Sequence, residues 1–251
     1  MTAPLDAGPR ARAAGTPLNQ SIDRAAALLG FFTPERPELS LSELTSRLGT
    51  SKATAHRYAT ALRHAGLLRY EPGRQVYALG PRIVELAASA LAGLRIVRIA
   101  GPHMERLVAG LNETVVLSIW DGEAPVVVRV DDNTDRIARI VVATGTRLPF
   151  DSAQGKVFAA FGAEGAPRSV DGDELDRIRA SRVAINSRVV QGIRAVATPV
   201  FQETELVASM AVVGTTASVP DDADSSIAGA LREAADVLSA ELGFIHDERS
   251  G

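Results

Sequence analysis

The chain has 251 residues, enough for one large domain or two modest ones, and its 46% hydrophobic and 23% charged residues exclude a disordered or fibrous protein. Aromatic residues make up only 4%, so Ala, Val, Leu and Ile must form the cores, and the absence of cysteine excludes a disulfide scaffold, a thiolate metal site and a cysteine nucleophile. The net charge of −3 divides into +4 for residues 1–80 and −7 for residues 81–251, which suggests that only the first part meets a polyanion.

Residues 1–18 mix proline, glycine and arginine and are expected to form a disordered arm, because they hold no apolar stretch of signal-peptide length. The most apolar helical stretch, residues 83–100, is interrupted by Glu85, Arg95 and Arg98. A membrane span of about 20 apolar residues is therefore not expected. These features together predict a cytoplasmic protein.

The first predicted helix covers residues 19–32, with Ser21 as its N-cap and apolar residues that recur at helical spacing. A proline-containing segment ends it. Ser40 and Glu43 then have the spacing of a capping box, in which each side chain satisfies the exposed backbone amide of the other residue. This motif predicts a short second helix that ends near Gly49.

A third helix is expected to open at Thr50 or Ser51 and to end at Ala65, because Gly66 favours a left-handed stop. The apolar side of this helix would complete a helix-turn-helix unit. The opposite side has no acidic residue. It offers cations for phosphates, polar groups for base edges and a methyl group for thymine. A solvated face that is basic by chance is the alternative for this helix taken alone. The residues expected to contact DNA here are Ser51, Lys52, Ala53, Thr54, His56, Arg57 and Thr60.

Residues 67–70 and 75–79 are two strand-like runs, and the Pro-Gly pair between them indicates a hairpin. A hairpin directly after a recognition helix is typical of the wing of a winged helix-turn-helix domain. Arg74 lies at the expected tip, where it would reach the DNA backbone or the minor groove. Residues 19–80 are therefore predicted to form a DNA-binding domain.

Residues 81–98 are predicted to form a linker helix that dimerises. Pro81 suits a first helical turn, and apolar residues recur at helical spacing after it. Small residues such as Ala88 and Gly93 would let a second helix approach closely. The alternative is that this segment is the first helix of the second domain's core.

Residues 99–246 combine helical and strand patterns. The strands are joined mostly as hairpins, with helices before, between and after them, which favours an antiparallel sheet in an α+β domain. A small-molecule pocket is expected between this sheet and its covering loops. Strands are predicted at 114–120, 125–130, 137–142, 195–201 and 206–213, and helices at 104–111, 152–161, 173–183 and 220–242.

Short motifs occur in both parts of the chain. Those of the first part are 21–25 (SIDRA), 41–44 (LSEL), 49–57 (GTSKATAHR), Leu62 and 66–68 (GLL). Those of the second part are 145–149 (GTRLP), 153–156 (AQGK) and 192–201 (GIRAVATPVF). Through these motifs the chain resembles the IclR family of bacterial transcriptional regulators along nearly its whole length.

This resemblance implies a winged helix-turn-helix head, a linker helix and a GAF-like domain that binds a small organic effector. It also implies a homodimer or a dimer of dimers that binds palindromic promoter DNA and acts as a repressor or an activator.

Two segments depart from the family pattern. Where the family often carries a Gly-Tyr-Ala motif and an acidic pair, this chain has residues 183–188 (VAINSR). Where the family usually has Ser-x-Ser-Gly-Pro, this chain has residues 211–215 (AVVGT), with both serine positions apolar. Since those serines help to hold a carboxylate in some members, we expect a larger, partly apolar or aromatic effector in place of the smallest carboxylates. The predicted pocket residues are Trp120, Arg129, Ser152, Ala153, Gln154, Ala195, Ala211 and Val213.

Arg129 or Arg147 could pair with an anionic effector through a bidentate fork. Either arginine is equally consistent with a surface ion pair. The apolar pocket candidates, Trp120 above all, are equally consistent with ordinary core packing.

The alternative function is an enzyme built on the α+β body, with a helical appendage used only for oligomerisation. Gly155-Lys156 lacks the spacing of a phosphate-binding loop, and the sequence has no nucleophile-elbow motif. The four histidines are far apart, and the adjacent Asp131 and Asp132 are typical of a solvated turn. No catalytic residue, cofactor or metal is therefore predicted. The preferred function is a sequence-specific DNA-binding regulator whose operator affinity an effector modulates.

Overall fold

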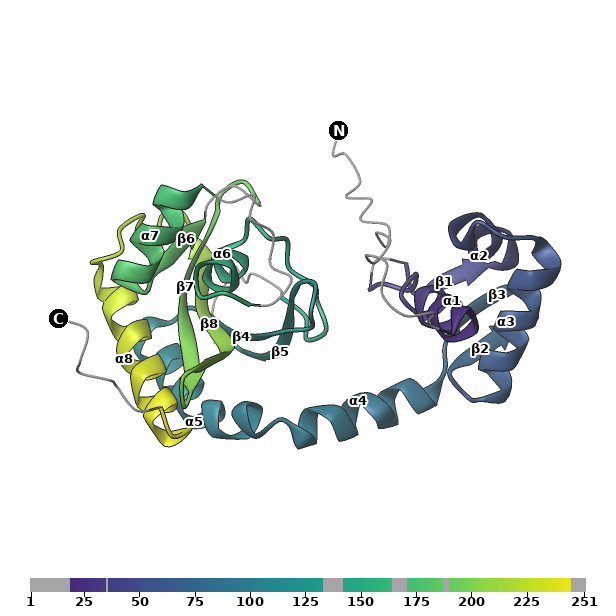
Figure 1. The fold of residues 1–251 in the computed structure, drawn as a ribbon, viewed down its shortest axis with the longest axis horizontal. Helices are drawn as coiled ribbons and strands as arrows, with labels where there is room; N and C mark the ends of the chain where they lie inside the picture. The colour runs from purple at the N-terminus through teal and green to yellow at the C-terminus, as the bar shows by residue number, and fades with distance from the viewer. Residues whose placement is uncertain (1–18, 35, 133–141, 164–170, 187–189, 245–251) are drawn as a thin grey trace. The chain divides into compact units, whose positions relative to one another are not determined.

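The computed structural model describes residues 19–34, 36–132, 142–163, 171–186 and 190–244 (Figure 1). The chain divides into two compact units, Met1–Ala90 and Leu91–Gly251, and each is described by itself. The predicted arm 1–18 and nearly all of the predicted strand 137–142 lie outside the described residues.

The first unit packs helices against a small antiparallel sheet with the strand order β1-β3-β2 (Figure 1). Its elements are α1 (Gln20–Leu29), β1 (Glu38–Ser40), α2 (Leu41–Leu48), α3 (Lys52–His64), β2 (Leu68–Glu71) and β3 (Val76–Leu79). The core between them includes Leu28, Phe31, Leu39, Leu44, Leu62 and Tyr77.

Local hydrogen bonds start and stop these helices. The predicted capping box is confirmed: Ser40 N–H donates to Glu43 Oε2 at 2.8 Å, and Glu43 N–H donates to Ser40 Oγ at 3.3 Å. Gly49 ends α2 in the left-handed region at φ 60°. The predicted N-cap of α1 is wrong, because Asn19 holds that position and its side chain accepts from Ser21 N–H at 3.1 Å.

The predicted linker helix is shorter than expected. Helix α4 covers Pro81–Gly93, and α5 begins at Arg95 and extends to Leu111. Between them Leu94 is extended, with φ −80° and ψ 97°, so residues 81–98 are not one helix. Gly93 is the last residue of α4, directly before this break.

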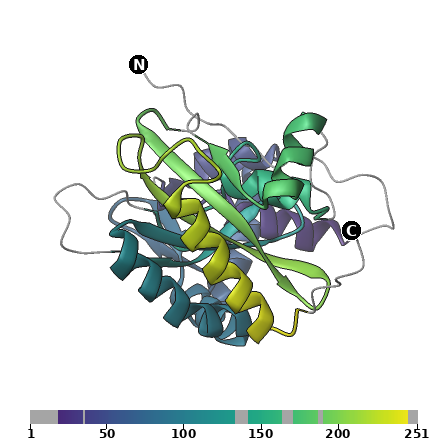
Figure 2. The ribbon, with the colours of Figure 1, turned by 90° about the vertical axis from the view of Figure 1, so that its left-hand side faces the viewer.

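The second unit is built on an antiparallel sheet with the strand order β5-β4-β8-β7-β6. Helices α5 and α8 lie side by side on one face of this sheet (Figure 2), and α6 and α7 cover the other face. The remaining elements are β4 (Thr114–Trp120), β5 (Pro125–Asp131), α6 (Ala153–Ala160), α7 (Gly172–Ser181), β6 (Ala184–Asn186), β7 (Ile193–Gln202), β8 (Glu205–Thr215) and α8 (Ser226–Glu241).

Side-chain alternation along the strands separates two cores in this unit. Val196 and Val212 pack beneath α5 and α8, whereas Ala197 and Ala211 pack beneath α6. The α6 side is therefore lined by smaller residues than the α5 and α8 side. That difference lets α6 lie close to the sheet.

Candidate DNA interface and effector site

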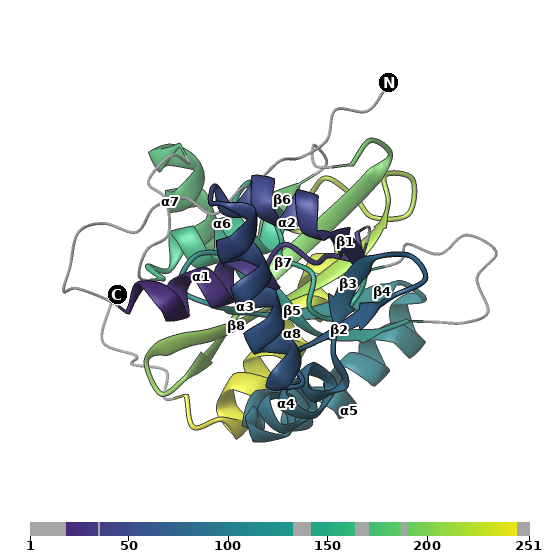
Figure 3. The ribbon, with the colours of Figure 1, turned by 90° about the vertical axis from the view of Figure 1, so that its right-hand side faces the viewer.

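Helix α3, labelled in Figure 3, has one exposed face that carries most of the predicted DNA contacts. Its other side is fixed in the core by Ala55, Ala59 and Leu62, all buried. The residues Lys52, Ala53, His56 and Arg57 are exposed. The helix contains no acidic residue.

The positive charges on this face are not neutralised by carboxylates of the described residues. Within the described part of the chain, Lys52 and Arg57 form no ion pair, and the Arg57 guanidinium lies 5.9 Å from the ring centroid of Tyr58. A hydrogen bond from the Ser21 side chain, at the start of α1, lowers the pKa of Tyr58. The face therefore combines uncompensated cations with a helix held against α1.

Ser51 and Thr54 have a local structural role at the start of α3. Ser51 Oγ accepts from Thr54 N–H at 3.3 Å and donates to Thr54 Oγ1 at 3.0 Å. This is an N-cap that satisfies a backbone amide without a helical partner. Both residues lie at the edge of the exposed face, with their hydroxyls already engaged.

Thr60 does not present its hydroxyl on this face. The residue is half-buried, and its Oγ1 is buried without a hydrogen-bond partner among the described residues. Helical periodicity shows which residues share a face of α3, but it does not show which residues from other elements cover that face. We therefore remove the Thr60 hydroxyl from the predicted contacts.

The predicted wing is a hairpin of β2 and β3, to which β1 adds a third strand. Arg74 lies in the turn, as expected from the Pro-Gly pair. Its Nη1 lies 2.6 Å from Glu38 Oε2 and 2.8 Å from Glu38 Oε1. Sequence reasoning missed this partner, because β1 was not predicted and its pairing with β3 brings Glu38 beside the turn.

In the second unit, the α6 side of β4 gathers aromatic residues. The ring of Trp120 lies 5.4 Å from that of Phe158 on α6 and 5.9 Å from that of Phe150 in the preceding loop. Gln154 is buried and its Nε2 donates to Ser209 O at 3.0 Å and to Val116 O at 3.4 Å. These contacts place α6 directly over β4 and β8.

Further along the same face lie the small candidates of β7 and β8. Ala195 pairs with Val213, and Ala197 pairs with Ala211. Ala153 of α6 packs in the same cluster as Ala211. The structure thus brings seven of the eight predicted pocket residues to the α6 side of one sheet: Trp120, Ser152, Ala153, Gln154, Ala195, Ala211 and Val213.

Ser152 serves the helix itself. Its Oγ accepts from Gly155 N–H at 3.0 Å and caps α6. A Cβ at Gly155 would collide with the backbone oxygen of Phe150, so only glycine allows the loop to approach α6 this closely.

Arg129, the eighth candidate, lies on the wrong side of the sheet. It pairs with Leu117, whose side chain faces α5 and α8, and it forms ion pairs with Asp131 at 3.0 Å and Glu105 at 3.1 Å. Its Nη1 lies 2.6 Å from where a Cβ of Gly101 would be. Arg129 therefore does not share the α6 side with the other seven candidates, because the strand register and not the residue type decides the face.

Arg147 is also engaged, with Asp121 at 2.8 Å and Glu123 at 3.2 Å. Arg147 therefore forms surface ion pairs, which was the alternative to its pairing with an anionic effector.

Ser118 is a buried polar residue on the α6 side that sequence reasoning missed. It is fully buried, and its Oγ has no hydrogen-bond partner among the described residues. Alternation along β4 places it between Val116 and Trp120 on the α6 side. The available signal was a serine in the middle of an otherwise apolar strand.

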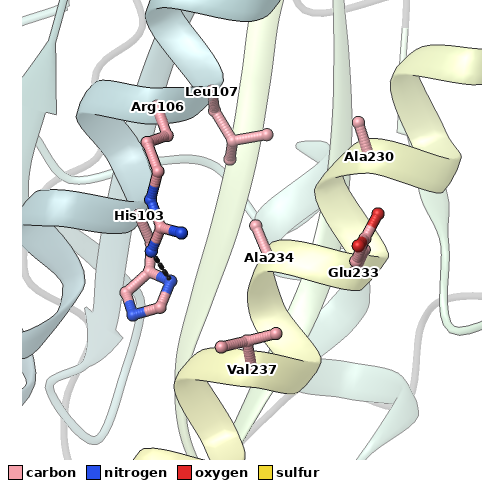
Figure 4. A pocket seen from close by; sticks show the side chains of 7 residues that line it. All are labelled: His103, Arg106, Leu107, Ala230, Glu233, Ala234 and Val237. Carbon is pink, nitrogen blue, oxygen red and sulfur yellow. Dashed lines mark hydrogen bonds between the residues drawn. The ribbon is translucent and has the colours of Figure 1, made fainter.

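A separate hollow of about 210 Å³ lies between α5 and α8 (Figure 4). Its polar lining includes His103, whose Nδ1 lies 3.0 Å from Arg106 Nη2, and Glu233. The predicted pocket residues are absent from its lining.

Within the described ranges, none of the helices is long and apolar enough to cross a membrane. Nor do the same residues include a cluster of three or more His, Cys, Asp or Glu side chains placed to hold a metal ion.

Comparison with known proteins agrees with this arrangement. Residues 21–72 match the IclR helix-turn-helix domain, and residues 88–170 match the bacterial transcriptional regulator IclR C-terminal domain. The HTH-type transcriptional regulator Rv1719 of Mycobacterium tuberculosis is 33% identical over 197 residues, covering 70% of this chain and 75% of its own.

Solved structures show the same fold. An IclR transcriptional regulator from Alicyclobacillus acidocaldarius has a TM-score of 0.75 at 24% identity, covering 89% of this chain and 98% of its own. An IclR homologue from Microbacterium hydrocarbonoxydans, solved in complex with 4-hydroxybenzoate, has a TM-score of 0.72 at 20% identity, covering 89% and 99%. The domains and relatives matched are transcriptional regulators and not enzymes. The chain therefore belongs to the IclR family of transcriptional regulators, and its first unit contains that family's DNA-binding helix-turn-helix domain.

Proposed function

We propose that this regulator binds promoter DNA through α3 and the wing, and that a small organic effector bound on the α6 side of the second unit modulates its operator affinity. The exposed face of α3 carries the first half of this proposal. Lys52, His56 and Arg57 lie together there without a carboxylate on the helix. Such a face suits the phosphates and base edges of a major groove. Promoter binding also implies a cytoplasmic protein.

We expect a homodimer, or a dimer of dimers, on a palindromic operator. Two-fold protein symmetry matches two half-sites about one helical turn apart. The apolar residues of α4 support this assembly, since Val84 is 71% exposed and Leu86 is 52% exposed in the single chain. A second copy of α4 would cover them.

The composition of the α6 side favours an aromatic effector with a polar substituent. Trp120, Phe150 and Phe158 supply aromatic surface, and Ala211 and Val213 are apolar. Ser118 supplies a buried hydroxyl without a partner in the described chain, which a hydroxyl or carboxylate of the ligand would satisfy. The 4-hydroxybenzoate complex of the Microbacterium homologue makes that compound the first probe.

Arg57→Ala tests the DNA half. The shift of a duplex from upstream of the protein's own gene should weaken with this change and with rising salt, because phosphate contacts release counterions. If Arg57 reads a base edge, its removal would cost about 1–3 kcal/mol and relax specificity at that position. Unchanged binding by a folded Arg57→Ala protein would remove α3 as the recognition helix.

Intrinsic fluorescence tests the effector half directly, because Trp120 is the single tryptophan of the chain. Titration with 4-hydroxybenzoate should change this emission and also the DNA shift. Glyoxylate and pyruvate serve as controls for the smallest carboxylates. Tight binding of either control, with no response to bulkier acids, would overturn the aromatic assignment.

A further inference from the structure

The wing arginine has a carboxylate partner from a different strand. Arg74 Nη1 contacts both carboxylate oxygens of Glu38, at 2.6 and 2.8 Å. Within the described residues, Nε and Nη2 of Arg74 make no hydrogen bond. The Arg74 side chain remains 65% exposed, whereas that of Glu38 is 25% exposed.

We propose that Glu38 is a positioning residue for DNA binding: it holds Arg74 through one nitrogen and leaves the rest of the guanidinium free for a DNA phosphate. This inference rests on the proposed DNA-binding function of the first unit. It assigns a favourable role in DNA binding to an acidic residue, although a carboxylate is repelled by the phosphates of DNA.

The two partners differ in how firmly the backbone fixes them. Glu38 belongs to β1, where it pairs with Ala78 of β3, and Ser40 of the capping box closely follows it. Arg74 lies in the turn of the wing, where its N–H donates to Glu71 O at 3.3 Å. A fixed carboxylate therefore orders a flexible arginine before DNA arrives. Ordering a long side chain in advance reduces the entropy lost on binding.

If Glu38 positions Arg74, removal of Glu38 should weaken DNA binding. If Glu38 acts only through its charge, its removal should have the opposite effect. Removing any carboxylate from a surface that meets DNA should tighten binding, because it removes like-charge repulsion. Glu71 is the matched control, since it lies exposed in the same wing and its side chain makes no ion pair with Arg74 among the described contacts. If Glu38 positions Arg74, Glu38→Ala should therefore lower the DNA affinity, whereas Glu71→Ala should not.

The experiment measures binding of the full chain to a labelled random-sequence DNA duplex by fluorescence anisotropy over a range of salt concentrations. Arg74→Ala should reduce the salt slope by about 0.9 for each wing that no longer contacts a phosphate. Glu38→Ala should weaken binding severalfold and lower the slope, whereas Glu71→Ala should leave binding equal or tighter. The double variant, Glu38→Ala with Arg74→Ala, should bind no more weakly than Arg74→Ala alone.

Glu38→Gln serves as the conservative variant, because glutamine keeps an acceptor for Arg74 without the charge. It should bind closer to the parent protein than Glu38→Ala does, and it keeps the test usable if the alanine variant is unstable. Tighter binding by both Glu38 variants, or a Glu38 effect that persists in the Arg74→Ala background, would overturn the inference. If Arg57→Ala weakens DNA binding and the Glu38 variants do not change it, the positioning role of Glu38 is refuted and the proposed DNA interface stands. If neither change affects DNA binding, the proposed interface itself is refuted.

Discussion

Replacing Ser118 with alanine is expected to stabilise the second unit, although most substitutions in a core destabilise. The Ser118 side chain is fully buried and its hydroxyl has no partner among the described residues. A buried, unsatisfied polar group costs about 1–3 kcal/mol of folding free energy, and alanine removes that group while leaving only a small void. For a unit of this size the midpoint should rise by about 2–4 °C for each kcal/mol gained.

Ser209 provides the matched control for this prediction. It is the cross-strand neighbour of Ser118 and is equally buried, but its Oγ donates to Thr198 O at 3.1 Å. Ser209→Ala should therefore lower the free energy of unfolding by about 0.5–1.5 kcal/mol. The two changes remove the same atom from adjacent positions, and they are expected to act with opposite sign.

Thermal unfolding followed by tryptophan fluorescence measures both variants in the full chain, because Trp120 reports on the second unit only. If the proposed effector site takes 4-hydroxybenzoate, Ser118→Ala should also bind this compound more weakly, by about tenfold for each 1.4 kcal/mol of hydrogen bonding removed. Higher stability combined with weaker ligand binding would identify Ser118 as a ligand group. A midpoint lowered by as much as in Ser209→Ala would refute the reasoning, because the Ser118 hydroxyl would then be satisfied within the protein.

Other predictions concern the caps and ion pairs. Ser40→Ala should reduce the free energy of unfolding of the first unit by about 1 kcal/mol, measured by denaturant unfolding. Hydrogen bonds from Ser40 lower the pKa of Glu43, so the capping box should stabilise the unit above the unfolded-state pKa and lose this effect as the pH falls through the folded-state value; a Ser40→Ala difference unchanged in acid would contradict this. Arg129→Ala should leave the fluorescence response to 4-hydroxybenzoate unchanged, because Arg129 faces away from α6. Loss of that response in the variant would show that Arg129 does contribute to the effector site.

Sequence reasoning succeeded where structure depends on close neighbours in the chain. The capping box of Ser40 and Glu43 is a three-residue spacing, and its hydrogen bonds are present. The Pro72-Gly73 turn likewise joins two short strands in register. Such features need no knowledge of what packs against them, because the atoms involved are supplied by one short segment.

The failures in the two candidate sites involve distant neighbours, unlike the local errors at the N-cap of α1 and at Leu94. Strand β1 is only three residues long and leads directly into α2, so its strand character comes from pairing with β3 and not from its own pattern. Arg129 alternates correctly within its strand, but a register shift between Leu117 and Ser118 and the pairing with β4 determine which face it occupies. The buried hydroxyl of Thr60 has the same origin, since nothing in α3 alone states which residues cover it.

Any effector control of DNA binding must also act in reverse. An effector shifts operator affinity only by its different affinities for the DNA-competent and incompetent states of the protein. If 4-hydroxybenzoate changes operator affinity by a given factor, operator DNA must change 4-hydroxybenzoate affinity by the same factor, typically about 5–150-fold. Because Trp120 belongs to the second unit and α3 to the first, one titration of Trp120 fluorescence with and without saturating operator duplex measures this factor independently of the DNA shift. Equal ligand affinities in both titrations, alongside a ligand-dependent DNA shift, would show that the shift arises from a binding site that Trp120 does not report.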